Sequence, residues 1–331
     1  MNLTKSNAGG FTAEQYVKYL VLGVHFQTKK QDMKKLSTLL ILSLLACSML
    51  WSNNLTEDFV FGDPDIKSMH ALAFGPQSIL FVGDSDAAQI VAVDLSAQKK
   101  AVNEEMSIPN LEETLSNLLG SSTDQFQIID MAVDPSNENV YIAVNHSSGK
   151  SLLFLVNNNT LESVPMDAVS YSKTELKNAV SAEAADRRGR SLRKWAISDL
   201  RFADGKVMVS GLSNAEFSST FRSISFPFNE SATQSSLEIY HAAHGKYETK
   251  SPIKTFTPIS INNKTQILAS YTCTPLVVFP MEELKDGKHT KGRTVAELGN
   301  WNTPLDIIEM EKEGQRYISV SYTHLTLPTK A

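Results

Sequence analysis

A two-strand motif that recurs five times constrains the fold of this chain more than any other feature. The first copy, "HALAFGPQSILFVGD" (70–84), alternates apolar and polar residues, turns, and continues into a second apolar run. The other copies span 127–144, 196–212, 256–271 and 303–320. Period-two alternation bounded by Gly, Asp or Asn turns predicts paired antiparallel strands. The chain is therefore expected to be all-β.

The spacing of the copies predicts the architecture. Aligned positions lie 48–69 residues apart and hold His70, Asp130, Asp199, Pro258 and Asp306. Most intervals leave room for two more strand-like runs, such as "SLLFLVN" followed by "TLESVPM". Four antiparallel strands per unit, repeated in this way, are typical of β-propeller blades. A β-sandwich is the main competitor, but it would not restart the same motif five times.

The number of blades follows less directly than the fold. Five blades are visible in the sequence, and roughly six are expected in the intact protein, with seven as the alternative. The lone run "DFVFG" (58–62) would complete the last blade and close the ring. The last copy lacks its outer strands, so the last blade is expected to be truncated. We assign the propeller to residues 58–320.

The motifs "HALAFGPQSILFVGD" and "DMAVDPSNENVYIAV" (130–144) resemble repeats of secreted bacterial β-propellers. The resemblance is to the YVTN, NHL and WD40-like groups of the quinoprotein amine dehydrogenase-like superfamily, and it covers residues 58–320. It implies the fold and carries no catalytic residues with it. The GH and WD dipeptides of a true WD40 protein are absent.

Two segments depart from plain blades. In "IPNLEETLSNLLG" (108–120), leucines at helical spacing follow a Glu-rich first turn, and Gly120 ends the run, which predicts a short helix. Residues 166–195 predict a long polar connection that could be part helical and that ends in a basic cluster.

The aligned positions supply the main site hypothesis. Rotation about a propeller axis would gather His70, Asp130, Asp199 and Asp306 in a ring at the mouth of the central channel. Carboxylates from several blades suit calcium, and a histidine suits a transition metal, so the ring could hold one divalent cation. In the alternative, each aspartate accepts backbone N–H groups from a neighbouring turn and fixes its blade.

Two further groups of residues are candidates for ligand binding, and a third pair is disfavoured. The residues that follow each second strand share the face of the ring, namely Asp84, His146, Asn214 and Cys273. Anion-binding candidates come from "DRRGRSLRKW", namely Arg187, Arg188, Arg190 and Arg193; the alternative is a solvated loop paired with its own acidic residues. His241 and His244 lie three residues apart in a strand-like run, which would put them on opposite faces and disfavours a zinc pair.

Both ends of the chain carry segments that we do not expect in the propeller. Residues 33–52 begin with Met33 and two lysines, followed by 15 uncharged residues, the order of a secretory or lipoprotein signal. Residues 1–32 would then be a spurious extension, with a signal anchor as the alternative. "LLAC" resembles a lipobox and makes Cys47 a lipidation candidate. The tail 321–331 resembles translated sequencing adapter.

Composition and motifs narrow the function. The net charge of −5 argues against nucleic-acid binding, and the P-loop, HExxH and GxSxG motifs are absent. We expect an extracytoplasmic module (periplasmic, secreted or lipid-anchored) that binds an envelope or extracellular protein, a peptide or a glycan through its top-face loops. The alternative is a metal-dependent hydrolase or lyase, lactonase-like or esterase-like, that acts on a small molecule at the channel mouth.

Overall fold

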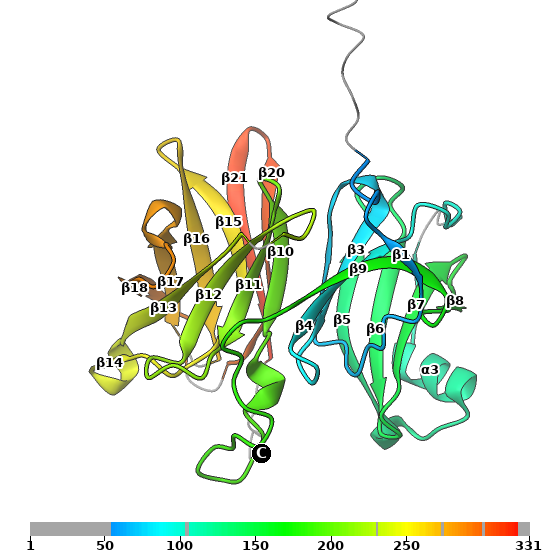
Figure 1. Cartoon of the computed structure of the whole chain (residues 1–331), viewed down its shortest axis with the longest axis horizontal. Helices are drawn as coiled ribbons and strands as arrows, with labels where there is room; N and C mark the ends of the chain where they lie inside the picture. The colour runs from blue at the N-terminus through cyan, green and yellow to red at the C-terminus, as the bar shows by residue number, and fades with distance from the viewer. Residues whose placement is uncertain (1–53, 103–105, 230, 273–274, 300–301, 324–331) are drawn as a thin grey trace, which may run out of the picture. The chain divides into compact units, whose positions relative to one another are not determined.

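Five β-sheets and one α-helix make up the described part of the chain (Figure 1). The structure, a computed structural model, describes residues 54–102, 106–229, 231–272, 275–299 and 302–323. They belong, apart from Asn54, to the second of two compact units, Leu55–Ala331. Three of the sheets have four or five strands that are antiparallel throughout, which confirms the predicted all-β propeller. The number of blades in the intact protein stays a prediction.

The strands of the five sheets run as follows, in order across each sheet. Sheet 1 contains β1 (Val60–Gly62), β9 (Val169–Glu175), β4 (Gln89–Asp94), β3 (Ile79–Asp84) and β2 (Ala71–Phe74). Sheet 2 contains β5 (Phe126–Val133), β6 (Val140–His146), β7 (Ser151–Asn157) and β8 (Thr160–Val164). Sheet 3 contains β10 (Asp199–Ala203), β11 (Lys206–Leu212), β12 (Ser219–Ser225), β13 (Ala232–His241) and β14 (Lys246–Glu248), with β18 (His289–Lys291) parallel to β13.

The last two sheets follow in the chain. Sheet 4 contains β15 (Ile253–Ile261), β16 (Lys264–Tyr271), β17 (Pro275–Pro280) and β19 (Arg293–Glu297). Sheet 5 contains β20 (Pro304–Lys312) and β21 (Gln315–Tyr322), so β21 extends to the second residue of the segment 321–331. Residues 324–331 lie outside the described residues, and so does the predicted signal with Cys47.

The hairpin turns explain why the motif recurs. Three of the inner hairpins turn through two residues that both have a positive φ, namely Asp204–Gly205, Asn262–Asn263 and Glu313–Gly314. Type I′ turns need that conformation, which glycine and asparagine adopt most easily, and their twist matches that of paired strands. The turns therefore set the register of each hairpin locally.

The sheets pack in an order that differs from their order in the chain. Shared apolar clusters join sheet 2 to sheet 1, sheet 1 to sheet 3, sheet 3 to sheet 4, and sheet 4 to sheet 5. Sheet 1 thus lies between sheets 2 and 3, and its strand β3 is buried along its whole length. Side chains from both neighbouring sheets cover its two faces.

Strand β9 makes this order possible. After sheet 2 the chain returns to pair β9 with β4 on one side and β1 on the other, and then begins sheet 3 (Figure 1). The prediction that 166–195 is a polar connection is therefore wrong for Val169–Glu175. In the run "VSYSKTE" only Val169 is buried, and the other residues are half-buried or exposed, so the apolar alternation that marks a strand is weak.

The predicted helix is confirmed as α3 (Leu111–Leu119). The Asn110 side chain accepts the Glu113 N–H at its start, and Gly120 ends it with a left-handed φ of 62°. Leu115 is fully buried against strands of sheet 2. In the described residues no helix is long and apolar enough to cross a membrane.

Candidate functional site

One residue of each inner strand occupies an equivalent position, and in three of the five strands a β-bulge precedes it. In the first hairpin of sheet 2 the pairing shifts between Ile128 and Asp130, and sheets 4 and 5 shift in the same way before Thr255 and Asp306. In sheet 1, the N–H of His70 donates to Gly83, whose Cα partner is Ala71. The equivalent residues are therefore Ala71, Asp130, Asp199, Thr255 and Asp306.

The alignment of the copies consequently differs at two positions from the one drawn from the sequence. Ala71 takes the place expected for His70, and Thr255 takes the place expected for Pro258. A bulge adds one residue to a strand without changing its apolar alternation elsewhere, so the alternation alone cannot locate it. His70 is partly buried, and its Nδ1 lies 3.0 Å from Ser68 Oγ.

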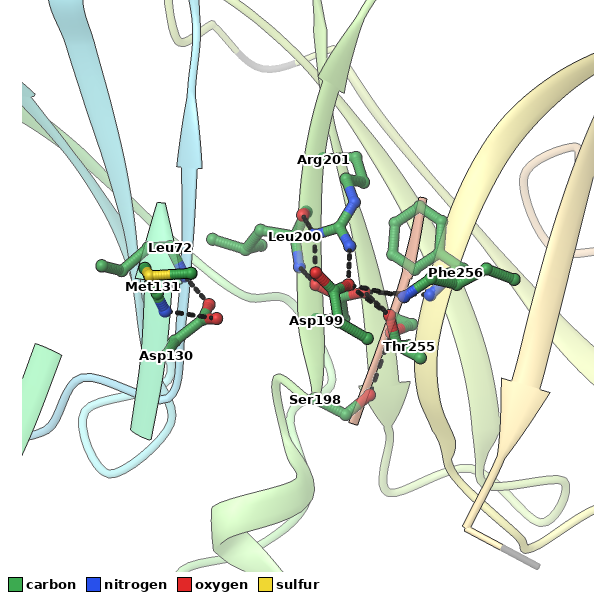
Figure 2. Close-up of polar contacts among 12 residues, drawn as sticks. Leu72, Asp130, Met131, Ser198, Asp199, Leu200, Arg201, Thr255 and Phe256 are labelled. Carbon is green, nitrogen blue, oxygen red and sulfur yellow. Dashed lines mark hydrogen bonds and ion pairs between the residues drawn. The ribbon is translucent and has the colours of Figure 1, made fainter. Parts of the chain in front are cut away.

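Asp130 and Asp199 each join the inner strands of two neighbouring sheets (Figure 2). Asp130 Oδ1 accepts the N–H of Met131 at 2.8 Å, and its Oδ2 accepts the N–H of Leu72 on β2 at 2.7 Å. Asp199 repeats the pattern on the other side of sheet 1. Its Oδ1 accepts the next N–H along β10, and its Oδ2 accepts the N–H of Phe256 on β15 at 2.9 Å. This geometry is that of the blade-fixing alternative.

Arg201 links the second and third aspartates. Its Nη1 lies 2.8 Å from Asp199 Oδ1 and its Nη2 lies 2.6 Å from Asp306 Oδ1. Thr255 Oγ1 donates to both carboxylates, at 2.9 Å and 3.2 Å. Sequence reasoning missed both residues. Arg201 is two residues beyond Asp199 on a strand and so shares its face, which is the signal that could have found it.

The cluster of three carboxylates and one guanidinium shifts the acidity of its members. Burial raises the pKa of Asp130 to about 7, with the nearby charge of Asp199 adding to the rise and two backbone N–H groups opposing it. Burial also raises the pKa of Asp199, although Arg201 opposes this. Asp306 is the most open of the three, since 54% of its side chain is exposed. The structure thus brings together three of the four predicted ring residues.

The top-face candidates have separate surroundings. Asp84 is fully buried and accepts N–H groups from Lys67, Ser68 and Ala87, so it anchors a turn. His146 Nδ1 accepts the Ser148 N–H, and its Nε2 lies 3.0 Å from Ser121 Oγ. Asn214 is exposed, and its backbone N–H donates to Asn178. Cys273 lies outside the described residues.

The arginine candidates differ in their contacts, since Arg190 and Arg193 bind groups of the protein and Arg187 and Arg188 extend into solvent. Arg193 donates to the carbonyl groups of Asp86 and Val180, which fastens the segment to sheet 1. Arg190 pairs with Asp186 at 2.6 Å. Hydrogen bonds from the Arg190 backbone and side chain lower the pKa of Asp186 to about 2. Arg187 and Arg188 are exposed at the tip between them.

His241 and His244 face each other, with ring centroids 4.0 Å apart. The expectation that they occupy opposite faces of a strand is wrong, because β13 ends at His241 and a 3₁₀ turn, Ala242–His244, follows. The glycine after this turn was the available signal: "HAAHG" ends in a residue suited to a left-handed φ.

No protein-family model matches the chain, and no curated protein matches it. Among solved structures, it is similar to virginiamycin B lyase from Staphylococcus aureus, with 10% identity, a TM-score of 0.28, and coverage of 75% of this chain and 76% of that one. A PQQ-bound aldose sugar dehydrogenase from Streptomyces coelicolor is 10% identical, with a TM-score of 0.26, and the match covers 78% of this chain and 95% of that one. A Trypanosoma rangeli sialidase is 9% identical, with a TM-score of 0.25, and the match covers 78% of this chain and 42% of that one.

Proposed function

We propose that this chain is an extracytoplasmic binding module that uses a built surface loop to recognise an acidic protein or peptide segment, or an anionic glycan. The observation that carries the proposal is the hairpin at Asp186–Arg190. Asp186 accepts the N–H groups of Arg188 and Arg190 as well as the Arg190 guanidinium. A loop held this way presents the Arg187 and Arg188 side chains with little backbone freedom to lose on binding.

The base of this hairpin is also fastened. Ala185 pairs with Ser191, and Leu192 N–H donates to Ala184. Two adjacent guanidinium groups on a fixed loop suit the planar geometry of carboxylates, which arginine binds through two parallel hydrogen bonds. Asp130 and Asp199 weigh against the competing metal site, because their carboxylate oxygens already accept backbone N–H groups.

The test is binding of the full chain to immobilised polyglutamate, polygalacturonate and a neutral glycan. The variant R187A/R188A should lose about tenfold or more in affinity for an anionic ligand, with a weaker dependence on salt. The matched control is K206A/K312A, which removes two exposed cations at hairpin turns. Equal binding by wild type and R187A/R188A would overturn the proposal.

The second candidate is a metal-dependent hydrolase or lyase that uses Asp130, Asp199 and Asp306 of the inner-strand cluster. The observation in its favour is the pKa of Asp130, about 7, since a group that titrates near neutrality can act as a general acid or base. Elemental mass spectrometry of wild type and D130N, both checked for folding by circular dichroism, tests it. A stoichiometric metal lost only in D130N, together with hydrolysis of esters or lactones by the wild type, would favour the enzyme.

The extracytoplasmic location rests on residues 33–52 and is tested separately. Fusing this segment to alkaline phosphatase should give activity outside the cytoplasm. If Cys47 is lipidated, labelled palmitate should appear in the wild type and be lost in C47A. Retention of the fusion in the cytoplasm would contradict the location without affecting the binding test.

A further inference from the structure

The hairpin at the outer edge of sheet 3 brings two imidazoles and a carboxylate together. Strand β14 returns antiparallel to β13, so that His241 pairs with Lys246 and Ile239 pairs with Glu248. His241 and Glu248 therefore lie on one face of the hairpin, as diagonal neighbours. The 3₁₀ turn carries His244 back over the same face, and Gly245 closes it with a left-handed φ of 62°.

The donor atoms are close enough to share one ion. His244 Nδ1 is 2.7 Å from Glu248 Oε1, and His241 Nδ1 is 3.4 Å from Glu248 Oε2. One ligand atom from each residue lies within 4.8 Å of the others. Atoms that bind one Zn²⁺ at about 2.1 Å are separated by at most about 4.2 Å. Small side-chain rotations thus suffice, and the turn residue His244 has the freedom to make them.

The surroundings of the three residues favour a metal-binding site over a simple histidine–glutamate pair at the surface. The side chain of His241 is fully buried and that of Glu248 is 14% exposed, whereas that of His244 is 49% exposed. Two ligands are consequently fixed by strands, and the third faces the solvent through which an ion would enter. Ser251 Oγ donates to Glu248 Oε2 at 2.9 Å, an outer hydrogen bond of the kind that orients metal-binding carboxylates.

Two other charged groups border the cluster. Lys246 Nζ is 3.7 Å from Glu248 Oε1, but its side chain is 64% exposed and can move into solvent. Glu297 Oε1 accepts the N–H of Ala242 and so holds the turn. An ion bound between the two histidines and Glu248 would displace the Lys246 ammonium and would leave the contact of Glu297 with the turn in place.

We propose that His241, His244 and Glu248 bind one divalent transition-metal ion, with zinc the best fit. Two imidazole nitrogens and one carboxylate oxygen form a three-ligand set that zinc accepts with a fourth position open to water or another ligand. Calcium prefers six to eight oxygens and is not suited. The site uses residues outside the inner-strand cluster and the Asp186–Arg190 loop, so it stands independently of the proposed function.

The test is titration of Zn²⁺ into chelator-treated full-length chain by calorimetry, with Co²⁺ absorbance as the probe of geometry. We expect one zinc per chain and cobalt bands of the intense, four-coordinate type. H244A should weaken zinc binding at least about tenfold while leaving the fold intact, because His244 lies on an exposed turn. E248Q, which keeps the side-chain shape and removes the charge, should weaken it as well.

The matched control is H289A. His289 Nε2 lies 3.2 Å from Glu238 Oε2 in the same sheet, and its ring packs against Phe217, so it forms a histidine–glutamate pair of similar geometry. This variant should bind zinc like the wild type. The proposal is overturned if the wild type binds no zinc at millimolar concentration, or if H244A and E248Q bind it as tightly as H289A does.

Discussion

The carboxylate of Asp199 accepts the backbone N–H of Phe256 at 2.9 Å, so a single side chain joins the inner strands of sheets 3 and 4. Asp130 does the same for sheets 2 and 1 through Leu72. Asp130 follows a bulge, and both aspartates accept the N–H of the residue after the equivalent position in the neighbouring sheet. The shared strand position thus directs each carboxylate toward the next sheet.

The variant D199A should be strongly destabilised. It leaves the Phe256 N–H without its acceptor and deprives Arg201 of a buried partner, which together should cost about 3–5 kcal/mol in the free energy of unfolding. Urea denaturation measures this loss. The control D306A changes a half-exposed carboxylate with the same Arg201 contact and should cost less than about 1 kcal/mol. Equal losses would contradict the role assigned to Asp199.

The stability of the protein should fall as the pH rises from about 4 to 7 because of Asp130. Its pKa rises from the usual 3.8 to about 7 on folding, so in this window the folded chain holds a proton that the unfolded chain has released. Below pH 4 the stabilisation is fully present. Asparagine at this position cannot ionise, so wild type should lose about 1–4 kcal/mol relative to D130N across the window.

Denaturation of both proteins at pH 4, 5, 6 and 7 checks this expectation. D130N also replaces one carboxylate oxygen of Asp130 by an amide NH₂ group. The cost of that change is independent of pH, so the comparison rests on the slope of the free energy of unfolding against pH. Parallel stability curves for wild type and D130N would show that the carboxyl of Asp130 titrates normally.

The packing of sheet 1 against sheet 3 should be visible at Gly83. A Cβ at this position would lie 2.7 Å from Ile197 Cγ2, so G83A should destabilise the protein by about 1–3 kcal/mol. Removing the Ile197 side chain opens the space, and G83A should then cost less in an I197A background. A double-mutant cycle measures the coupling. Additive effects would contradict direct contact between these sheets.

Replacing Arg222 by methionine should leave the protein equally stable or stabilise it. Arg222 is 3% exposed, and its Nη1 has no hydrogen-bond partner among the described residues. Burial lowers its pKa to about 10, which reflects the cost of keeping the charge away from water. Methionine keeps the length without the charge, so we expect a gain of about 0–2 kcal/mol. A loss of stability in a thermal melt would show instead that the hydrogen bonds of Arg222 to Gln234 and to the Leu212 carbonyl outweigh the cost of burying its charge.

Local signals were sufficient for the repeated inner hairpins and for the helix of this fold. The turn Asp204–Gly205 combines two residues that tolerate a positive φ, and the apolar alternation on either side of it defines a hairpin wherever the rest of the chain lies. Helix α3 is equally local, because its cap Asn110 and its stop Gly120 lie next to the residues they act on. The all-β class and the repeated hairpins therefore follow from the sequence by itself.

Only the tertiary structure decided which elements meet. The return of β9 to sheet 1 and the contact of Arg201 with Asp306 join residues far apart in the chain, and a bulge brings Thr255 into register with the aspartates. Such contacts depend on how whole sheets pack, and apolar alternation is the same whichever sheet becomes the neighbour. His241 and Glu248 meet for a related reason: a single turn, rather than the strand pattern before it, reverses the chain and sets their distance.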